Sequence, residues 1–159
     1  MPSPVVSRDE IKEGLVHARG GGTPEWGAPL AHETFALYYR IVGELVRSGC
    51  SVIAEAAYLT DMTQEVAALV PEADACIVHC QVDHDVAVAR FVERSATDPI
   101  RRASHPDAEI VAAMEGGTFA WERYEPMELG IPVLRVDTTN GYQPVLEDVV
   151  AFSRGGPLR

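Results

Sequence analysis

The 159 residues carry 13 basic and 24 acidic side chains, and this formal net charge of −11 disfavours a nucleic-acid-binding surface, which is normally basic. The hydrophobic share of 47% and the length predict a single domain over residues 1–159 and exclude a disordered chain. No apolar run reaches the roughly 18 residues that span a membrane, no basic-then-apolar leader opens the chain, and three cysteines are too few for a disulfide framework. We therefore expect a cytoplasmic protein.

The N-terminal part of the chain predicts a strand, a short helix, a loop and a long helix. Apolar residues 4–6 form the strand, and the short helix covers about 10–17. Residues 20–27 are rich in glycine, which predicts a flexible loop. Apolar side chains then recur at three- and four-residue spacing over 31–48, which is typical of an amphipathic helix.

Strands and helices alternate in the remainder of the chain. We expect strands at 50–54, 75–80 and 131–136, and helices at 62–70, 85–94, 107–124 and 144–153. A polar, arginine-rich segment at 95–106 separates the second of these helices from the third. Because several of these strands lack polar alternation, the pattern predicts an α/β fold with a parallel sheet. No internal repeat or linker divides it.

The cations are unevenly distributed. The chain has a single lysine, Lys12, and no Gly-Lys pair, whereas a nucleotide-binding P-loop requires G-x-x-x-x-G-K-[ST]. Four arginines gather in one short stretch: Arg90, Arg94, Arg101 and Arg102. An anion site needs only such a local cluster, so the acidic composition does not exclude a phosphorylated ligand.

Four segments taken in order resemble landmarks of the small P-loop kinases, the group that holds the zeta toxins, chloramphenicol phosphotransferase and related AAA-type kinase domains. Residues 4–11 resemble a strand with an Asp-bearing turn, and residues 49–56 resemble a strand that ends in a site carboxylate. Residues 90–102 resemble an arginine-bearing lid, and residues 133–139 resemble the last strand and the turn near the nucleotide base. The resemblance covers nearly the whole chain. It implies a parallel-sheet, three-layer P-loop NTPase fold with a lid at about 90–106, ATP and Mg²⁺ as cofactors, and a small-molecule hydroxyl as acceptor.

The P-loop strand, loop and helix, roughly 25–30 residues, have no counterpart ahead of Pro4. In the resembling kinases this strand lies at the centre of the sheet. We therefore expect an N-terminally truncated fold whose central strand is absent, with two inner strand edges left unpaired. Either the sheet closes up, another chain supplies the strand, or the natural protein begins upstream of Met1, which is the alternative favoured here.

Asp9 and Glu55 are the candidate catalytic carboxylates. In the resembling kinases the aspartate at this turn orients the acceptor hydroxyl and takes its proton. A helix N-cap is the alternative for Asp9. Glu55 ends an apolar strand, where open α/β sheets bind ligands, so it would assist through Mg²⁺-bound water or position the acceptor. The alternative is a carboxylate that emerges into solvent.

The resemblance also assigns the arginines and the last turn. Arg94 would neutralise charge that develops on a transferred phosphoryl group. Contacts with the nucleotide would come from Arg90, Arg101, Arg102, Asp137 and Thr138. The alternatives are an exposed basic face and a turn cap. A metal site is not predicted, because the nearby cysteines and histidines lack zinc-site spacing: Cys76, His79, Cys80 and His84.

The sequence thus predicts an ATP-dependent small-molecule kinase-like protein, inactive or impaired in this form because the Walker A loop is missing. The alternative is a non-catalytic remnant of a kinase fold that binds a small molecule or a partner. A homo-oligomer joined through exposed strand edges is a further possibility.

Overall fold

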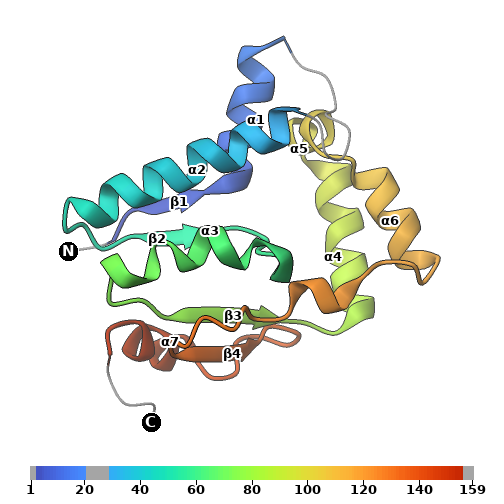
Figure 1. The fold of residues 1–159 in the computed structure, drawn as a ribbon. Helices are drawn as coiled ribbons and strands as arrows, with labels where there is room; N and C mark the ends of the chain where they lie inside the picture. Colours follow the sequence, from blue (N-terminus) through green and yellow to red (C-terminus); the bar gives the residue numbers. More distant parts are fainter. Residues whose placement is uncertain (1–2, 21–28, 156–159) are drawn as a thin grey trace.

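The computed structural model describes residues 3–20 and 29–155, so most of the predicted glycine-rich loop lies outside the described residues. Helices and strands alternate along the chain (Figure 1). The elements are β1 (Val5–Ser7), α1 (Arg8–Ala18), α2 (Pro29–Arg47), β2 (Ile53–Glu55), η1 (Thr60–Met62), α3 (Thr63–Ala67), η2 (Val70–Glu72), β3 (Ile77–Gln81), α4 (His84–Thr97), α5 (Pro99–Ser104), α6 (Asp107–Glu115), η3 (Trp121–Tyr124), β4 (Val133–Asp137) and α7 (Leu146–Ser153), where η marks a 3₁₀-helix.

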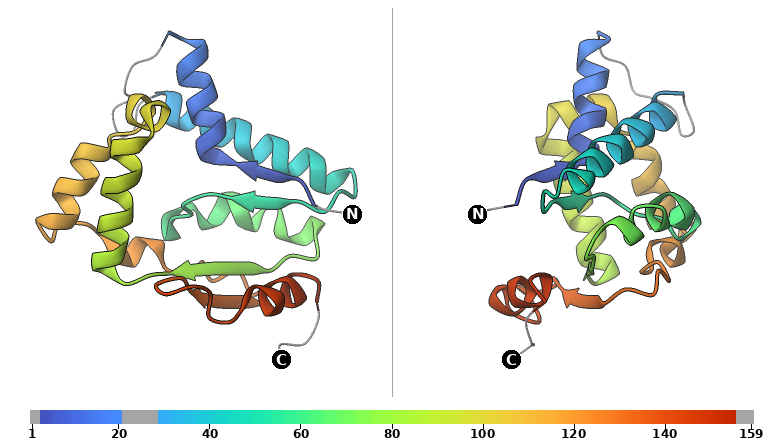
Figure 2. Two further views of the ribbon diagram at one scale, coloured as in Figure 1. Left: turned by 180° about the vertical axis from the view of Figure 1, so that it is seen from behind. Right: turned by 60° about the vertical axis from the view of Figure 1, so that its left-hand side comes forward.

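The four strands form two separate parallel pairs. β1 pairs with β2, with Ser7 opposite Glu55, and β3 pairs with β4, with Gln81 opposite Asp137. Figures 1 and 2 show the order β1, β2, β3, β4 across the molecule, with all four strands running in one direction. Within the described ranges no ladder joins β2 to β3. The structure is therefore mixed α/β with short parallel sheets, as the alternation of elements predicts.

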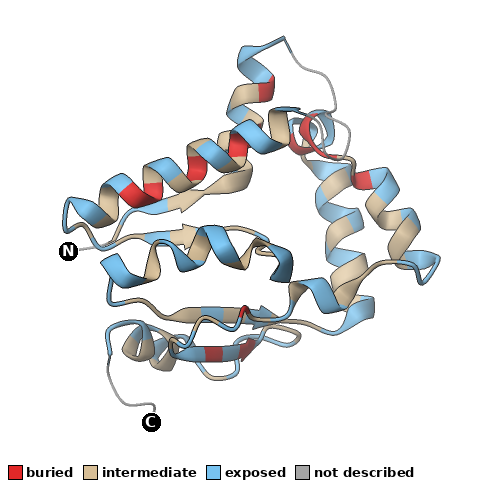
Figure 3. Ribbon diagram, in the orientation of Figure 1, coloured by how far each residue is buried: buried red, intermediate tan, exposed pale blue. Residues whose placement is uncertain are grey.

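The strands carry apolar side chains that remain exposed. Val5 and Ile53 on the first pair, and Val78 and Val133 on the second, are all exposed. The buried residues instead gather in α2, around the junction of α1 with α5 and α6, and in β4 (Figure 3). Buried side chains therefore lie mainly on the helices and on β4, and no residue of β1, β2 or β3 is buried.

Helix α2 has the amphipathic pattern expected of it. Its buried positions lie on one face, at Thr34, Tyr38 and Val42, because residues four apart in a helix stack above one another. The helix ends in a Schellman motif: the Cys50 N–H donates to the Leu45 carbonyl at 2.9 Å, and the N–H of Gly49 donates to the carbonyl of Val46 at 2.8 Å. Gly49 has φ +72°, a conformation that glycine adopts without strain.

One predicted helix boundary was wrong, and one helix was not predicted. The helix expected over 107–124 ends at Glu115, because Gly116 and Gly117 follow and Gly117 has φ +68°. The polar segment 95–106 contains a helix of its own. Asp98 caps α5 by accepting from the N–H groups of Ile100 (2.9 Å) and Arg101 (3.0 Å).

The other boundary differences are smaller. The strand expected at 50–54 begins only at Ile53, because the Schellman turn occupies the residues before it. The helix expected over 62–70 reduces to α3 with a 3₁₀ turn on either side. In the described parts of the chain, no helix is both long and apolar enough to cross a membrane.

Candidate functional site

The parallel pairing of β1 with β2 brings the two predicted carboxylates to one edge. Ser7 and Glu55 end the two strands in register, and the Ser7 hydroxyl donates to Glu55 Oε2 at 2.6 Å. Asp9 lies two residues further on, in the first turn of α1. Ligands of open α/β sheets bind at this carboxyl edge, so the edge is the candidate site.

Asp9 is held by two arginines. The guanidinium of Arg8 pairs with Asp9 Oδ1, and Arg101 Nη1 lies 3.4 Å from Asp9 Oδ2. Arg101 comes from α5, so this contact fastens the arginine-rich segment to the start of α1. The Asp9 side chain keeps 35% of its surface exposed, and it therefore remains accessible to a small molecule.

Arg101 forms a shorter and more buried ion pair with Asp107 than with Asp9. Its Nε lies 3.0 Å from Asp107 Oδ2 and its Nη2 3.4 Å from Oδ1, and both side chains are buried, at 9% and 3% exposed. The guanidinium also lies 5.1 Å from the centre of the Phe91 ring. A forked guanidinium–carboxylate pair of this kind fixes both partners. The structure thus places this predicted nucleotide-binding residue inside a buried ionic network.

Lys12 and His105 complete this network. Lys12 is 7% exposed, and burial, followed by the positive charge of Arg8, lowers its pKa. Burial lowers the pKa of His105 to about 4, so the ring is neutral at neutral pH. His105 Nε2 lies 3.1 Å from Glu13 Oε1, and this contact is a hydrogen bond rather than an ion pair above that pH.

A second group of predicted residues meets at the ends of β3 and β4. Arg90 Nη2 donates to the carbonyls of Thr138 (2.9 Å) and Thr139 (3.1 Å), so Arg90 and Thr138 are brought together. Asp137 Oδ1 accepts from the Thr139 N–H at 2.8 Å, and this backbone hydrogen bond lowers the pKa of Asp137. The turn cap that was the alternative for Asp137 is therefore present.

The remaining two arginines form no ion pair with Asp9. Arg94 is exposed, with its guanidinium 5.4 Å from the centre of the Phe91 ring. Arg102 is exposed and donates to the Ala96 carbonyl at 3.3 Å. Neither forms an ion pair with any residue whose position is described.

An aromatic group beside this edge was missed as a functional element. The hydroxyls of Tyr38 and Tyr58 contact each other, and Tyr58 Oη donates to the Ala54 carbonyl at 3.3 Å. On the next face of α2, Phe35 stacks on Tyr39 with centroids 6.2 Å apart, and the Arg8 guanidinium lies 5.1 Å from the Phe35 ring centre. Arg8 and Lys12 were not predicted as site residues either. The sequence feature that could have indicated them is their four-residue spacing along α1, with Asp9 between them.

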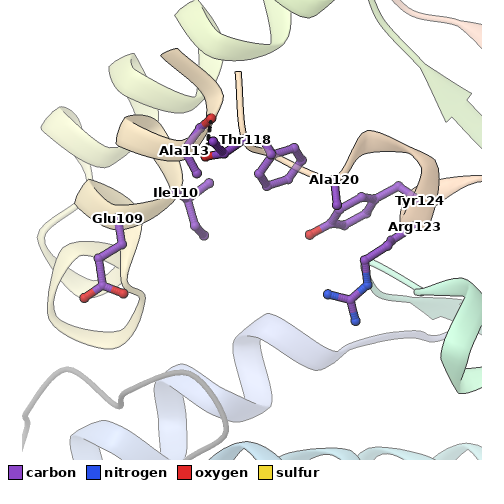
Figure 4. Close-up of a pocket in the computed structure, with 8 residues that line it drawn as sticks. Glu109, Ile110, Ala113, Thr118, Ala120, Arg123 and Tyr124 are labelled. Carbon is purple, nitrogen blue, oxygen red and sulfur yellow. Dashed lines mark hydrogen bonds between the residues drawn. The ribbon is translucent and has the colours of Figure 1, made fainter. Parts of the chain in front are cut away.

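A hollow of about 250 Å³ lies between α6 and η3 (Figure 4). Its walls include Ile110, Phe119 and Tyr124, and the guanidinium of Arg123 extends beside Tyr124. Arg123 Nη2 pairs with Asp61 Oδ2 at 2.6 Å. The hollow is therefore lined by both apolar and polar side chains, and its one cation is already paired.

The described residues do not fit ATP with Mg²⁺ in the manner of a P-loop. The lone lysine is buried on α1 among Arg8, Asp9 and Arg101, away from any glycine-rich turn that the structure describes. Among the same residues no group of three or more His, Cys, Asp or Glu side chains is placed to hold a metal ion.

Neither a protein-family model nor a curated protein matches the chain. A solved structure does: the crystal structure of a "putative kinase" from Chloroflexus aurantiacus J-10-fl superposes with a TM-score of 0.70 at 26% sequence identity. The match covers 96% of this chain and 82% of that one. The chain therefore has a kinase-like fold, with short parallel sheets.

Proposed function

We propose that this chain is a kinase-fold protein that binds a small hydroxylated molecule at the carboxyl edge of β1 and β2, and that by itself it transfers phosphoryl groups poorly or not at all. The observation that carries the proposal is the position of Asp9. It lies at the start of α1, partly exposed, with an arginine from each of two helices on its carboxylate oxygens. The kinase-like fold supports the same reading.

Asp9 would orient the acceptor. A carboxylate accepts a hydrogen bond from an acceptor hydroxyl, and it can take the proton when that oxygen becomes a nucleophile. Arg8 and Arg101 keep the carboxylate in one orientation, which is the role of positioning groups around a site. Glu55, hydrogen-bonded to Ser7 in the neighbouring strand, would contact the same molecule from the other side of the edge.

The proposal includes a P-loop type of fold in which the central strand belongs between β2 and β3. Three observations support it: the strand order, the shared strand direction, and the lack of a ladder between β2 and β3 in the described chain. One parallel strand there would pair with both edges. A glycine-rich turn and lysine after it would supply the cradle for ATP and Mg²⁺ that this chain, with no Gly-Lys pair, does not contain.

The alternative function is a non-catalytic kinase-fold remnant that binds a small molecule or a partner, including a second copy joined at strand edges. The buried ion pair between Arg101 and Asp107 favours this alternative, because it prevents the guanidinium from moving with a phosphoryl group during transfer. The two functions share the acceptor site. They differ in whether any nucleotide binding remains.

Acceptor binding can be tested without nucleotide. Thermal unfolding would be followed with a panel of sugars, nucleotide-sugars and hydroxylated antibiotics, since a ligand that binds only the folded state raises the unfolding temperature. A ligand found this way should bind more weakly to Asp9→Asn and unchanged to the exposed control Asp85→Asn. Equal binding to wild type and Asp9→Asn would contradict the assignment of Asp9.

A further inference from the structure

Among the residues that the structure describes, two buried polar side-chain atoms have no hydrogen-bond partner: Arg8 Nε and Tyr39 Oη. Native proteins rarely leave such atoms unsatisfied, and each one calls for a water, an ion or a ligand. Burial raises the pKa of Tyr39 to about 12, so the phenol keeps its proton at neutral pH. Both atoms are thus available hydrogen-bond donors, and their missing partner is an acceptor.

The two donors belong to one neighbourhood. The Arg8 guanidinium lies 5.1 Å from the centre of the Phe35 ring, and Phe35 stacks on Tyr39, four residues along α2. The charge of Arg8 also acts on the phenol of Tyr39. Because another part of the same guanidinium pairs with Asp9, a molecule that reaches Arg8 Nε lies next to the candidate base.

The neighbourhood mixes cations with carboxylates. The positive charges of Arg8 and Arg101 act on Lys12, together with the negative charges of Asp9 and Asp107. On the Tyr39 phenol the charge of Arg8 opposes that of Glu65. Lys12 itself forms no ion pair with a residue that the structure describes.

We propose that Arg8, Tyr39 and Lys12 form a binding site for an oxyanion, a phosphate or carboxylate group, carried by the small molecule that binds at Asp9. Buried cations that retain free donors bind such groups strongly, because charge-assisted hydrogen bonds are shorter and stronger than neutral ones. The anion accepts hydrogen bonds from both unpartnered donors and lies beside the positive charges of Arg8 and Lys12. The ligand is therefore a hydroxylated acid or phosphate ester rather than a neutral sugar or alcohol.

Tyr124 connects this site to the hollow between α6 and η3. Tyr124 lines the hollow (Figure 4). The charge of Arg8 acts on its phenol, after that of Arg123. The apolar walls at Ile110 and Phe119 offer room for the body of a ligand whose anionic group lies at Arg8. This inference rests on the proposed function only in treating the bound molecule as the acceptor, since anion binding itself needs neither a hydroxyl nor a nucleotide.

The single lysine makes the test direct. Protein prepared with ¹³Cε-labelled lysine reports on Lys12 alone, because the chain has no other lysine. Sodium phosphate and sodium acetate would be titrated separately at constant ionic strength set with sodium chloride. We expect a saturable shift of the Lys12 signal with phosphate, acetate or both, and the stronger of the two identifies the anionic group. Tyr39→Phe should weaken that binding about tenfold, because it removes a hydrogen bond to a charged group.

Tyr142→Phe is the matched control, since Tyr142 is 55% exposed and lies outside this cluster. It should bind the anion as the wild type does, and circular dichroism of all variants checks that they fold. The inference is overturned if neither anion gives a saturable shift, or if Tyr39→Phe and Tyr142→Phe bind equally well. Failure of the Asp9→Asn acceptor test with anion binding intact would instead remove the proposed function and leave the anion site standing.

Discussion

Arg101 joins two carboxylates that lie far apart in the sequence, Asp107 through Nε at 3.0 Å and Asp9 through Nη1 at 3.4 Å. The pair with Asp107 is buried, whereas Asp9 is partly open to solvent. This one side chain therefore connects the interior junction of α1, α5 and α6 to the candidate base at the sheet edge. Its loss should affect stability and acceptor binding together.

Arg101→Met should lower the free energy of unfolding by about 3–5 kcal/mol, because it leaves the Asp107 carboxylate buried without its partner. Urea unfolding measures this change. The matched control is Arg94→Met, which removes an exposed arginine and should change stability by no more than about 0.5 kcal/mol. Similar losses in the two variants would show that the buried pair with Asp107 is not what stabilises this junction.

The stability of the protein should fall as the pH falls from about 6.5 towards 4, and His105 is one cause. The unfolded histidine has the ordinary pKa of 6.5, whereas burial lowers the pKa of the folded one to about 4. Between these values the unfolded state binds the proton and the folded state does not, so acid favours unfolding. His105→Gln should flatten this part of the stability profile.

His17→Gln, at an exposed position on α1, is the control for the pH experiment. Its profile should follow that of the wild type, measured by urea unfolding at closely spaced pH values. An unchanged slope in His105→Gln would mean that His105 takes up its proton equally in both states, contrary to the buried position found here.

Two neighbouring tyrosines should respond in opposite directions to loss of the hydroxyl. Tyr39→Phe removes a buried hydroxyl without a partner and should raise the free energy of unfolding by roughly 1 kcal/mol. Tyr38→Phe removes a hydroxyl that contacts Tyr58 and should lower it by a similar amount, about 1 kcal/mol. Chemical denaturation compares them. A loss of stability in Tyr39→Phe equal to that in Tyr38→Phe would mean that the Tyr39 hydroxyl has a structural partner.

Alanine substitution at two glycines should change stability in opposite directions. Gly49 has φ +72° in the turn that ends α2, so Gly49→Ala should destabilise by about 1 kcal/mol or more. Gly14 lies within α1 with open space where a methyl group would be placed, so Gly14→Ala should stabilise by about 0.5–1 kcal/mol. Thermal unfolding distinguishes the two, and destabilisation of both would contradict the helical assignment at Gly14.

The strands and the meeting of two strand ends at Ser7 and Glu55 could be predicted because both depend on local patterns. The order of the strands was expected only from the resemblance to the small P-loop kinases. Apolar runs mark strands, and parallel strands place their carboxyl ends at one edge. Helix α2 could be predicted for a similar reason, since its apolar spacing persists over many residues. These features need no knowledge of what packs against them.

The position of Arg101 could not be predicted in this way. Its burial depends on Asp107, which follows a helix break at His105 and Pro106, and on the approach of α5 to α1. An arginine in a polar, charge-rich segment gives no local sign that it points inward. The break of the helix after Glu115 was missed for another reason: two adjacent glycines weaken a helix without deciding where it ends.

The central claim is that this chain retains an acceptor site but lacks a nucleotide cradle. Calorimetric titration of the purified 159-residue protein with ATP, with and without Mg²⁺, tests it most directly. The account predicts no saturable heat of binding under either condition. Micromolar binding that depends on Mg²⁺ would contradict it, because a nucleotide site would then exist without a Gly-Lys phosphate loop.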